Sequence, residues 1–318
     1  MKRVMLGSTG IEVSVVGFGV LPIGPSQLAL PVEQGAEIIR YALKNGVNFI
    51  DTAQYYRAYP YISKALENSA FDDVVICSKS LSSDYDGMME AIEEARQVLK
   101  RDVIDIFLMH EVRSGQLEMR EGAWKALQDA KRNGYVRAIG LSTHHVDVTS
   151  AAASIPELDV VFPLINYMGL GIRKGDAFAS REEMMEAISA CHKAGKGVFS
   201  MKAFGGGNLT HHYREALDYV FAQAEIDSVM IGFGKTEEID DLLAYLDGSM
   251  EPSYNPDVSH KKVYINQEDC EGCGACKAAC PAGAIFYNEN GLAEIDHATC
   301  LTCGYCSPVC PVRAIIMY

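Results

Sequence analysis

Eight of the ten cysteines fall in two copies of one spacing, C-x-x-C-x-x-C-x-x-x-C, and a proline follows each copy. Three closely spaced cysteines let one loop hold three irons of a [4Fe–4S] cube, and the fourth, turned away by the proline, reaches the neighbouring cube. The spacing therefore predicts two clusters. One would be bound by Cys270, Cys273, Cys276 and Cys310, and the other by Cys300, Cys303, Cys306 and Cys280.

Other uses of cysteine fit this pattern less well. A disulfide scaffold is typical of small secreted chains, and zinc sites usually pair two C-x-x-C knuckles rather than two runs of four. The two runs also belong to an internal repeat, because a shift of thirty residues matches Ile265 with Ile295. Cys77 and Cys191 lie outside the runs in apolar segments, where we expect them to serve in packing.

A second set of reactive side chains lies at the ends of successive apolar runs. Asp51, Lys79 and His110 each close one run, and Tyr56 follows Asp51 by five residues. A phenol with a pKa of ~10 donates its proton poorly near neutral pH unless its anion is stabilised, and a lysine ammonium beside it lowers that pKa. An aspartate can hold the lysine, and a histidine can donate a hydrogen bond to a substrate oxygen. The set therefore predicts acid–base catalysis with Tyr56 as the acid.

The elements that would position this set alternate along the chain up to about residue 246. Strands are predicted at residues 15–19, 48–51, 74–79, 104–110, 138–142, 160–164, 197–202 and 228–232. Helices are predicted at residues 33–45, 62–69, 87–100, 122–133, 146–155, 182–194, 212–224 and 237–246. A short hairpin at residues 4–6 and 12–14 precedes them.

Eight strand–helix units predict an α/β fold, a closed (β/α)8 TIM barrel, in which the carboxyl ends of the strands converge on the face that carries the site. A doubly wound sheet is the alternative that the pattern alone leaves open. Residues 247–260 are rich in Gly, Ser, Pro and Asn, which is typical of a linker. We therefore predict a barrel over residues 1–247, a linker over 248–262 and a small α+β iron–sulfur domain over 263–318.

Over roughly residues 1–246 the chain resembles the aldo-keto reductase family. The resemblance rests on the hairpin and on residues 17–19, 51–53, 124–127 and 134–142. It implies a (β/α)8 barrel, and the family's catalytic Asp, Tyr, Lys and His carry over to Asp51, Tyr56, Lys79 and His110. Tyr55 competes with Tyr56 for the role of the acid, but its spacing from Asp51 is one residue short. The segment 263–318 resembles a bacterial ferredoxin with two [4Fe–4S] clusters.

The resemblance also implies a nicotinamide site, for NADP or NAD, although the pattern is less complete there. Thr143 replaces the asparagine of the family's Ser-Asn pair, and Met201 replaces the aromatic residue that stacks on the nicotinamide. Glu238 lies where an arginine commonly binds the 2′-phosphate, so NADP versus NAD stays open. Residues 205–207, all glycine, could cradle phosphate or only shape a loop. The expected cofactor residues are Gly19, Val20, Leu21, Ser142, Thr143, Met201, Lys202, Phe204, Gly205, Gly232, Phe233, Gly234 and Lys235.

Composition limits the partners and the compartment. The 318 residues carry a formal net charge of −14, which disfavours nucleic acid or an anionic membrane as a partner. No apolar run approaches the ~20 residues of a membrane span, and no signal peptide is visible. We expect a cytoplasmic protein of an anaerobic organism, because free thiolates and oxygen-sensitive clusters suit a reducing interior.

Three functions remain open from the sequence. The first is an oxidoreductase that reduces or oxidises a small carbonyl or alcohol by hydride transfer, with the clusters adding an electron route or a docking surface for a redox partner protein. The second is an enzyme without nicotinamide chemistry, in which the clusters deliver single electrons to the substrate or to bound FMN. The third is an electron carrier or redox sensor that is not an enzyme. The complete acid–base set favours the first.

Overall fold

Eight parallel strands close into a barrel in the computed structural model, which describes residues 1–25, 27–256, 262–280, 282–300, 304, 306–307, 309–312 and 314–317. The strands are β3 (Val16–Gly19), β4 (Phe49–Asp51), β5 (Val75–Ser80), β6 (Ile104–Met109), β7 (Val136–Thr143), β8 (Val160–Pro163), β11 (Gly197–Ser200) and β12 (Ser228–Gly232). They pair in chain order, and β12 closes the ring on β3 with Gly232 opposite Gly19. The predicted (β/α)8 barrel is therefore confirmed, and the doubly wound sheet is excluded.

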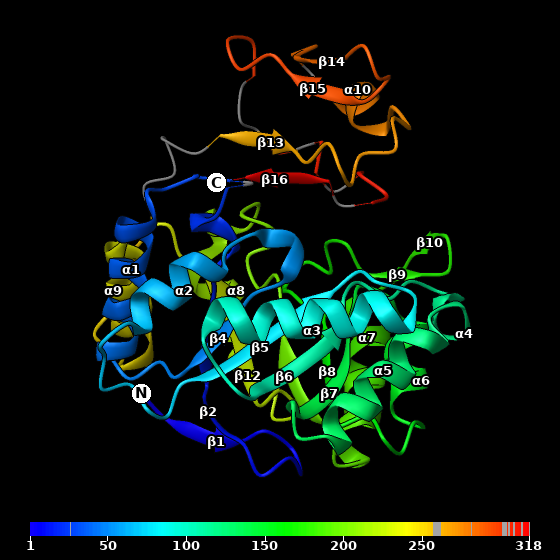
Figure 1. Cartoon of the computed structure of the whole chain (residues 1–318). Helices are drawn as coiled ribbons and strands as arrows, with labels where there is room; N and C mark the ends of the chain where they lie inside the picture. The colour runs from blue at the N-terminus through cyan, green and yellow to red at the C-terminus, as the bar shows by residue number, and fades with distance from the viewer. Residues whose placement is uncertain are drawn as a thin grey trace.

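Helices cover the outside of the barrel (Figure 1). They are α1 (Val32–Lys44), α2 (Tyr59–Leu66), α3 (Tyr85–Leu99), α5 (Glu121–Arg132), α6 (Val146–Ala152), α7 (Arg181–Lys193), α8 (Tyr213–Phe221) and α9 (Thr236–Leu246). Each buries an apolar stripe, as α1 does with Ile38, Ile39 and Leu43. A capping box fixes the start of α7, because the Ser180 hydroxyl accepts from the Glu183 N–H and the Glu183 carboxylate accepts from the Ser180 N–H.

A short antiparallel hairpin closes the amino-terminal end of the barrel. It consists of β1 (Arg3–Met5) and β2 (Glu12–Ser14). Leu6 and Ile11 between the two strands are at most 1% exposed and pack with side chains inside the barrel, among them Phe199. Because this end is filled with apolar side chains, the carboxyl ends of the strands form the face on which polar groups can gather.

Several predicted boundaries differ from the structure by a few residues, and two of these differences have clear reasons. The strand predicted at 197–202 ends at Ser200, because Lys202 adopts a left-handed backbone conformation with φ +60°. The helix predicted at 62–69 begins earlier, at Tyr59, with a proline in its first turn.

Several short elements gave no periodic signal in the sequence. They are α4 (Gln116–Met119), the hairpin of β9 (Arg173–Lys174) and β10 (Ala177–Phe178), and the 3₁₀ turns η1 (Leu21–Ile23), η2 (Gln54–Tyr56) and η3 (Thr210–His212). Each spans too few residues to show a helical or alternating pattern. Of these, η2 matters most, because it carries Tyr56.

The C-terminal segment 263–317, called the tail below, folds into two small antiparallel ribbons. In the tail, β13 (Val263–Ile265) pairs with β16 (Ile315–Met317), β14 (Ile285–Tyr287) pairs with β15 (Ala293–Ile295), and α10 (Ala275–Ala279) precedes β14. The thirty-residue repeat makes β13 equivalent to β15 and β14 equivalent to β16. Each ribbon therefore joins one strand from each repeat, and this interleaving agrees with the crossed cluster ligands that the spacing predicts.

The tail lies over the carboxyl ends of the barrel strands (Figure 1). The first part of the predicted linker packs against the barrel: Met250 is 8% exposed within its core, and the Tyr254 hydroxyl donates to the Asp241 carboxylate. The linker residues 257–261 lie outside the described residues. Among the helices that the structure describes, none is long and apolar enough to cross a membrane.

Candidate active site

Lys79 and Asp51 form a buried ion pair at the carboxyl ends of β5 and β4. The Lys79 Nζ donates to Asp51 Oδ1 at 2.6 Å and to the Thr52 carbonyl at 2.7 Å, and the two charged side chains are 1% and 7% exposed. Burial by itself lowers the pKa of Lys79, but the neighbouring Asp51 and Tyr56 outweigh burial and raise that pKa. Lys79 is therefore an ammonium at any pH near neutral.

Tyr56 and His110 meet beside this ion pair. The Tyr56 phenol oxygen lies 3.4 Å from Nε2 of His110, which directly follows β6. The two rings meet edge to face with their centroids 5.5 Å apart, and the Lys79 Nζ lies 5.1 Å from the centre of the Tyr56 ring. The structure thus brings together all four residues of the predicted acid–base set.

Burial and charge act in opposite directions on Tyr56. Burial is the larger effect and raises the pKa of Tyr56 to about 12, while the Lys79 ammonium lowers that pKa, which is the direction expected of it. The phenol consequently holds its proton near neutral pH and has one to donate.

His110 is held in its neutral form. Burial, followed by the positive charges of Lys79 and Arg120, lowers the pKa of His110 well below its usual value. Its Nδ1 is buried and has no hydrogen-bond partner among the described residues. A neutral imidazole can carry its proton on Nε2 and donate it to an oxygen in the cavity.

Arg120 fixes the two strand ends that carry Lys79 and His110. Its guanidinium donates to the carbonyls of His110 at 2.8 Å, Ser80 at 3.0 Å and Ser82 at 3.0 Å, and the residue is 5% exposed. Sequence reasoning missed Arg120, because an arginine just before a helix looks like an ordinary surface residue. It is a positioning residue that holds the backbone of the site.

A cavity of about 800 Å³ contains the acid–base set, and this volume is typical of small-ligand sites. The cavity extends from Tyr56 and His110 toward the start of α9. All of the expected cofactor residues except Val20 line it: Gly19, Leu21, Ser142, Thr143, Met201, Lys202, Phe204, Gly205, Gly232, Phe233, Gly234 and Lys235. Val20 is fully buried, and its N–H donates to the Asp51 carbonyl at 3.0 Å. Val20 thus supports the end of β4 and does not line the cavity, and a role for it in cofactor binding stays a prediction.

The hydroxyl groups at the end of β7 are largely used within the protein. The Ser142 hydroxyl accepts from the Glu111 N–H at 2.9 Å. The Thr143 hydroxyl donates to the Val112 carbonyl at 2.6 Å and accepts from the His145 N–H at 2.9 Å. Thr143 thus holds together the loops after β6 and β7. Its hydroxyl is therefore poorly placed to replace the asparagine of the family's Ser-Asn pair. The Ser142 hydroxyl, in contrast, still has a proton to donate.

The start of α9 carries a carboxylate where a phosphate could bind. Gly234 and Lys235 lead into this helix, and the Glu238 carboxylate accepts from the Gly234 N–H at 2.7 Å. The N-terminus of a helix attracts anions. Here the Glu238 carboxylate occupies the position of such an anion, and Glu237 adds a second negative charge in the first turn.

The loop after β11 depends on glycine for its shape. Gly205, Gly206 and Gly207 have φ values of +58°, +69° and +89°, a conformation that residues with side chains rarely adopt. Phe204, which directly precedes these glycines, stacks on Tyr213 with the ring centroids 4.9 Å apart. Shaping the loop therefore accounts for the glycines, and a phosphate cradle there stays a prediction.

The cysteines of the tail fit the predicted clusters where they are described. Cys276 and Cys310 are buried in the apolar core of the tail, and Cys270 packs against that core. Burial raises the pKa of Cys276, and the charges of Cys310, Cys270 and Cys273 raise it further. The Cys270 sulfur accepts from the N–H groups of Gly272 at 3.5 Å and Ala293 at 3.4 Å. Such bonds stabilise thiolates that bind a cluster.

The second set of ligands is only partly described. Cys306 is buried in the apolar core of the tail, Cys280 and Cys300 pack against that core, and Cys303 lies outside the described residues. The Cys280 sulfur accepts from the Ala284 N–H at 3.3 Å. Within the described part of the chain no three His, Cys, Asp or Glu side chains gather around a single metal ion, but thiolates around a cube lie further apart than the ligands of one ion.

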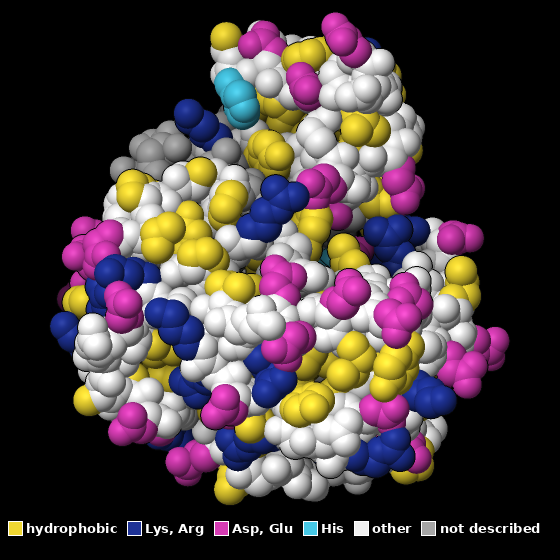
Figure 2. All heavy atoms as spheres, in the orientation of Figure 1, with side chains coloured by type: hydrophobic (Ala, Val, Ile, Leu, Met, Phe, Trp, Pro, Cys, Tyr) yellow, Lys and Arg dark blue, Asp and Glu magenta, His cyan; other side chains and the backbone are white. Residues whose placement is uncertain are grey.

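The tail also forms part of the wall of the cavity. Its lining residues are Asn266, Asp269, Ser307, Val312, Ile315 and Ile316, and Lys262, which precedes the tail, also lines the cavity. Figure 2 shows a hollow between the tail and the barrel, with acidic and basic side chains around its rim.

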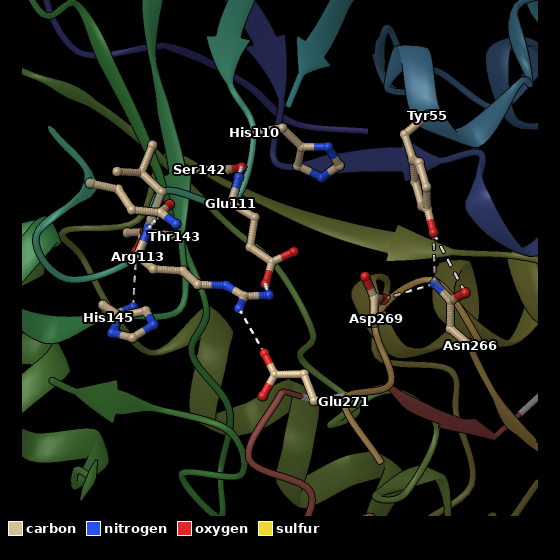
Figure 3. A network of polar contacts seen from close by, with 12 residues as sticks. Tyr55, His110, Glu111, Arg113, Ser142, Thr143, His145, Asn266, Asp269 and Glu271 are labelled. Carbon is tan, nitrogen blue, oxygen red and sulfur yellow. Dashed lines mark hydrogen bonds and ion pairs between the residues drawn. The ribbon is translucent and has the colours of Figure 1, made fainter. Parts of the chain in front are cut away.

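Polar contacts between described residues join the tail to loops that follow barrel strands. Asn266 Nδ2 donates to the Tyr55 hydroxyl at 3.1 Å (Figure 3). Glu271 pairs with Arg113 at 3.5 Å, and Asn208 donates to the Ser307 hydroxyl at 2.8 Å. Tyr55 is thus bound to the tail while Tyr56 faces His110, and this arrangement separates the two tyrosines that competed for the acid role.

Comparison with known proteins agrees with this architecture. Residues 15–218 match the model of the aldo/keto reductase family, which covers more than half of the chain. The chain belongs to the aldo/keto reductase family. Residues 263–317 match the model of the 4Fe-4S dicluster domain. The barrel of this aldo/keto reductase is therefore joined to an iron–sulfur domain, and the chain is an oxidoreductase, which sets aside the non-catalytic carrier.

The relatives of this aldo/keto reductase are distant. L-galactose dehydrogenase from Arabidopsis thaliana is 24% identical over 281 residues, which are 75% of this chain and 86% of that protein. Methylglyoxal reductase DkgA from Yersinia pestis is 25% identical over 230 residues, 70% of this chain and 78% of that protein. A solved structure, a putative aldo-keto reductase from Pseudomonas aeruginosa, superposes with a TM-score of 0.65 at 23% identity and covers 78% of this chain and 95% of its own.

Proposed function

We propose that the barrel transfers a hydride between a nicotinamide cofactor and a small carbonyl compound or alcohol, with Tyr56 as the acid–base residue. The observation that carries this proposal is the meeting of Tyr56, His110, Lys79 and Asp51 in one cavity. The names of two relatives, a sugar dehydrogenase and a methylglyoxal reductase, describe reactions of the same kind in opposite directions.

Each side chain of the acid–base set has its own role in carbonyl reduction. Bound nicotinamide supplies the hydride. His110 donates a hydrogen bond from Nε2 and orients the carbonyl oxygen next to the Tyr56 hydroxyl. Tyr56 gives its proton to that oxygen, and the Lys79 ammonium stabilises the phenolate that remains. Asp51 holds Lys79 in place, and alcohol oxidation uses the same residues in reverse.

The proposed nucleotide is NAD(H) in preference to NADP(H). A 2′-phosphate at the start of α9 would have to approach Glu237 and displace Glu238 from the Gly234 N–H. Like charges at such short range disfavour binding. Lys235 alone in this turn offers positive charge against two carboxylates. The adenosine of NAD, which has a 2′-hydroxyl there, meets no such repulsion and can donate to a carboxylate.

The proposed role of the clusters is electron transfer near the cavity. Asp269, which lines the cavity, precedes the ligand Cys270, and Ser307, which also lines it, follows the ligand Cys306. This proximity is the observation that favours a second candidate function, in which the clusters pass single electrons to a substrate in the barrel. A flavin such as FMN draws no support from either matched family, and a redox partner protein stays a proposal.

The change Tyr56→Phe tests the proposed function. We expect it to lower kcat for aldehyde reduction with NADH at least a hundredfold, because general acid catalysis contributes about 10²–10⁴-fold. The visible absorbance of the clusters should not change, since Tyr56 lies in the barrel. Steady-state assays under anaerobic conditions provide the measurement.

Tyr41→Phe is the matched control, because it removes a phenol that binds Asp240 on the outside of the barrel. This variant should keep its activity. If Tyr56→Phe keeps its activity as well, the assignment of the acid is wrong.

A further inference from the structure

The iron–sulfur tail contributes polar side chains to the same cavity as the acid–base set. Asn266 and Asp269 from the tail and Glu111 from the barrel line this cavity together with Tyr56 and His110. Figure 3 shows Glu111 and Asp269 on opposite sides of an open space below His110. The charges of both carboxylates reach Tyr56, where they oppose ionisation of the phenol. Both lie close to the proposed reaction centre.

Asn266 forms part of the cavity wall and also holds the tail against the barrel. The residue is 8% exposed, and its Nδ2 donates to the Tyr55 hydroxyl at 3.1 Å and to Asp269 Oδ2 at 2.8 Å. Its Oδ1 accepts from the Glu268 N–H at 3.2 Å, and its backbone carbonyl accepts from the Cys270 N–H at 3.0 Å. The loop that carries a cluster ligand is thereby joined to Tyr55, the neighbour of the proposed acid.

The two carboxylates are suited to bind hydroxyl groups rather than a cation. Glu111 already pairs with Arg113 at 3.2 Å, and Lys202 and Arg113 both act on Asp269 electrostatically. Each carboxylate thus already has a cation acting on it, and each has about four lone-pair positions. Among the described residues, Asn266 is the donor bonded to the Asp269 carboxylate, and it uses Oδ2. Unused acceptors beside a cavity favour a ligand that donates hydrogen bonds.

We propose that Asn266 and Asp269 of the tail are part of the substrate site and that Asp269, with Glu111, accepts hydrogen bonds from the hydroxyl groups of a hydroxylated carbonyl compound or its alcohol. The inference rests on the proposed function. It makes the iron–sulfur domain a determinant of substrate specificity, whatever electrons its clusters carry. A substrate without hydroxyl groups would use the barrel alone and gain nothing from the tail.

Two four-carbon aldehydes separate these contributions. Erythrose carries hydroxyl groups along its chain and butanal carries none. We expect Asp269→Asn to raise KM for erythrose about tenfold, the effect of losing one hydrogen bond to a charged group. KM for butanal should change far less, because this aldehyde has no hydroxyl group to donate to Asp269. Asn266→Asp keeps the acceptor for the Glu268 N–H but loses the donor to Tyr55, and it should show the same split between the two aldehydes.

Glu289→Gln is the matched control, because it removes one carboxylate from an exposed position of the tail. It should behave as the wild type with both aldehydes. The visible absorbance of each purified variant shows whether the clusters are intact. If Asp269→Asn with intact clusters changes KM for erythrose and butanal equally, or for neither, the inference is overturned.

Calorimetry with erythritol decides the inference even if the proposed function fails, because this polyol binds without turnover. We expect Asp269→Asn to weaken its binding to the oxidised holoprotein about tenfold, and Glu289→Gln not to weaken it. Equal binding by all three proteins, or no binding by the wild type, would contradict the inference. Absence of turnover of both aldehydes by the wild type would count against the proposed function alone.

Discussion

At the scale of single residues, burial and neighbouring charges shift the pKa values of Tyr56 and Lys79 in opposite directions, whereas both lower the pKa of His110. Removing one member of the Asp51–Lys79 pair leaves an uncompensated buried charge, which typically costs about 3–5 kcal/mol of stability. Variants of either residue would therefore lose structure along with activity. The Tyr56 phenol is neutral, so replacing it with phenylalanine removes one oxygen and leaves the charges paired.

Glu238 is the residue whose exchange should alter the choice of nucleotide. Glu238→Arg removes the carboxylate from the Gly234 N–H and adds a cation at the start of α9. We expect kcat/KM for NADPH relative to NADH to rise at least tenfold, because one charge-assisted hydrogen bond contributes about 1.5–3 kcal/mol. Steady-state kinetics with both nucleotides measure the ratio.

Glu237→Arg is the control for this exchange, since Glu237 lies in the same turn but its carboxylate is 3.5 Å from the Thr236 hydroxyl instead. It should shift the ratio less than Glu238→Arg does. An unchanged ratio in Glu238→Arg would mean that the ribose of the nucleotide binds elsewhere.

At the scale of elements, the site depends on where strands end and on what holds those ends. The barrel brings the carboxyl ends of β4, β5 and β6 side by side, but the backbone beyond β5 and β6 needs further support. Arg120, at the start of α5, supplies it with bonds to the carbonyls of Ser80, Ser82 and His110. Glu111, next to His110, adopts a left-handed backbone with φ +48° and shows how tightly this turn is constrained.

Replacing Arg120 should weaken both the fold and the site. Arg120→Met leaves three carbonyls without their donor, and we expect a loss of about 2–3 kcal/mol, or roughly 3–6 °C in Tm. Thermal unfolding of the holoprotein followed by circular dichroism provides the measurement. Arg132→Met, on the exposed end of α5, should stay within about 1 °C of the wild type. Equal Tm values for the two variants would show that Arg120 does not hold these strand ends.

The elements that could be predicted from the sequence are those with a clear period. The β12 strand has the predicted bounds, and the long helices were found because their apolar stripes recur every three to four residues. The strand that ends at Ser200 is predicted to extend too far, because the left-handed backbone conformation of Lys202 leaves no pattern in the sequence. The four acid–base residues could be placed together because parallel strands of a barrel converge at their carboxyl ends.

At the scale of the whole molecule, the contact between tail and barrel could not be predicted from the sequence. Asn266 and Tyr55 are separated by 211 residues, and neither stands out by its type or spacing. The internal repeat explained how the tail folds but not where it docks. Docking over the open end of the barrel places Asp269 and Ser307, each next to a predicted cluster ligand, in the wall of the cavity that contains the acid–base set. In the proposed function, the two-electron chemistry of a nicotinamide and the one-electron chemistry of iron–sulfur cubes would share this cavity.

This proximity makes the path of the reducing equivalents the central question. Hydride transfer moves hydrogen from C4 of the nicotinamide directly to the substrate carbon. Single-electron delivery from the clusters would instead leave that carbon to take its hydrogen from water. The two routes therefore differ in the origin of one hydrogen atom in the product.

Reduction of butanal with NADH deuterated at both C4 positions, in ordinary water without oxygen, distinguishes these routes most directly. Mass spectrometry of the butanol reads the isotope on its first carbon. Hydride transfer in the barrel predicts one deuterium on that carbon in every product molecule. Butanol that carries only hydrogen from water, formed while the visible absorbance of the clusters changes with turnover, would contradict it.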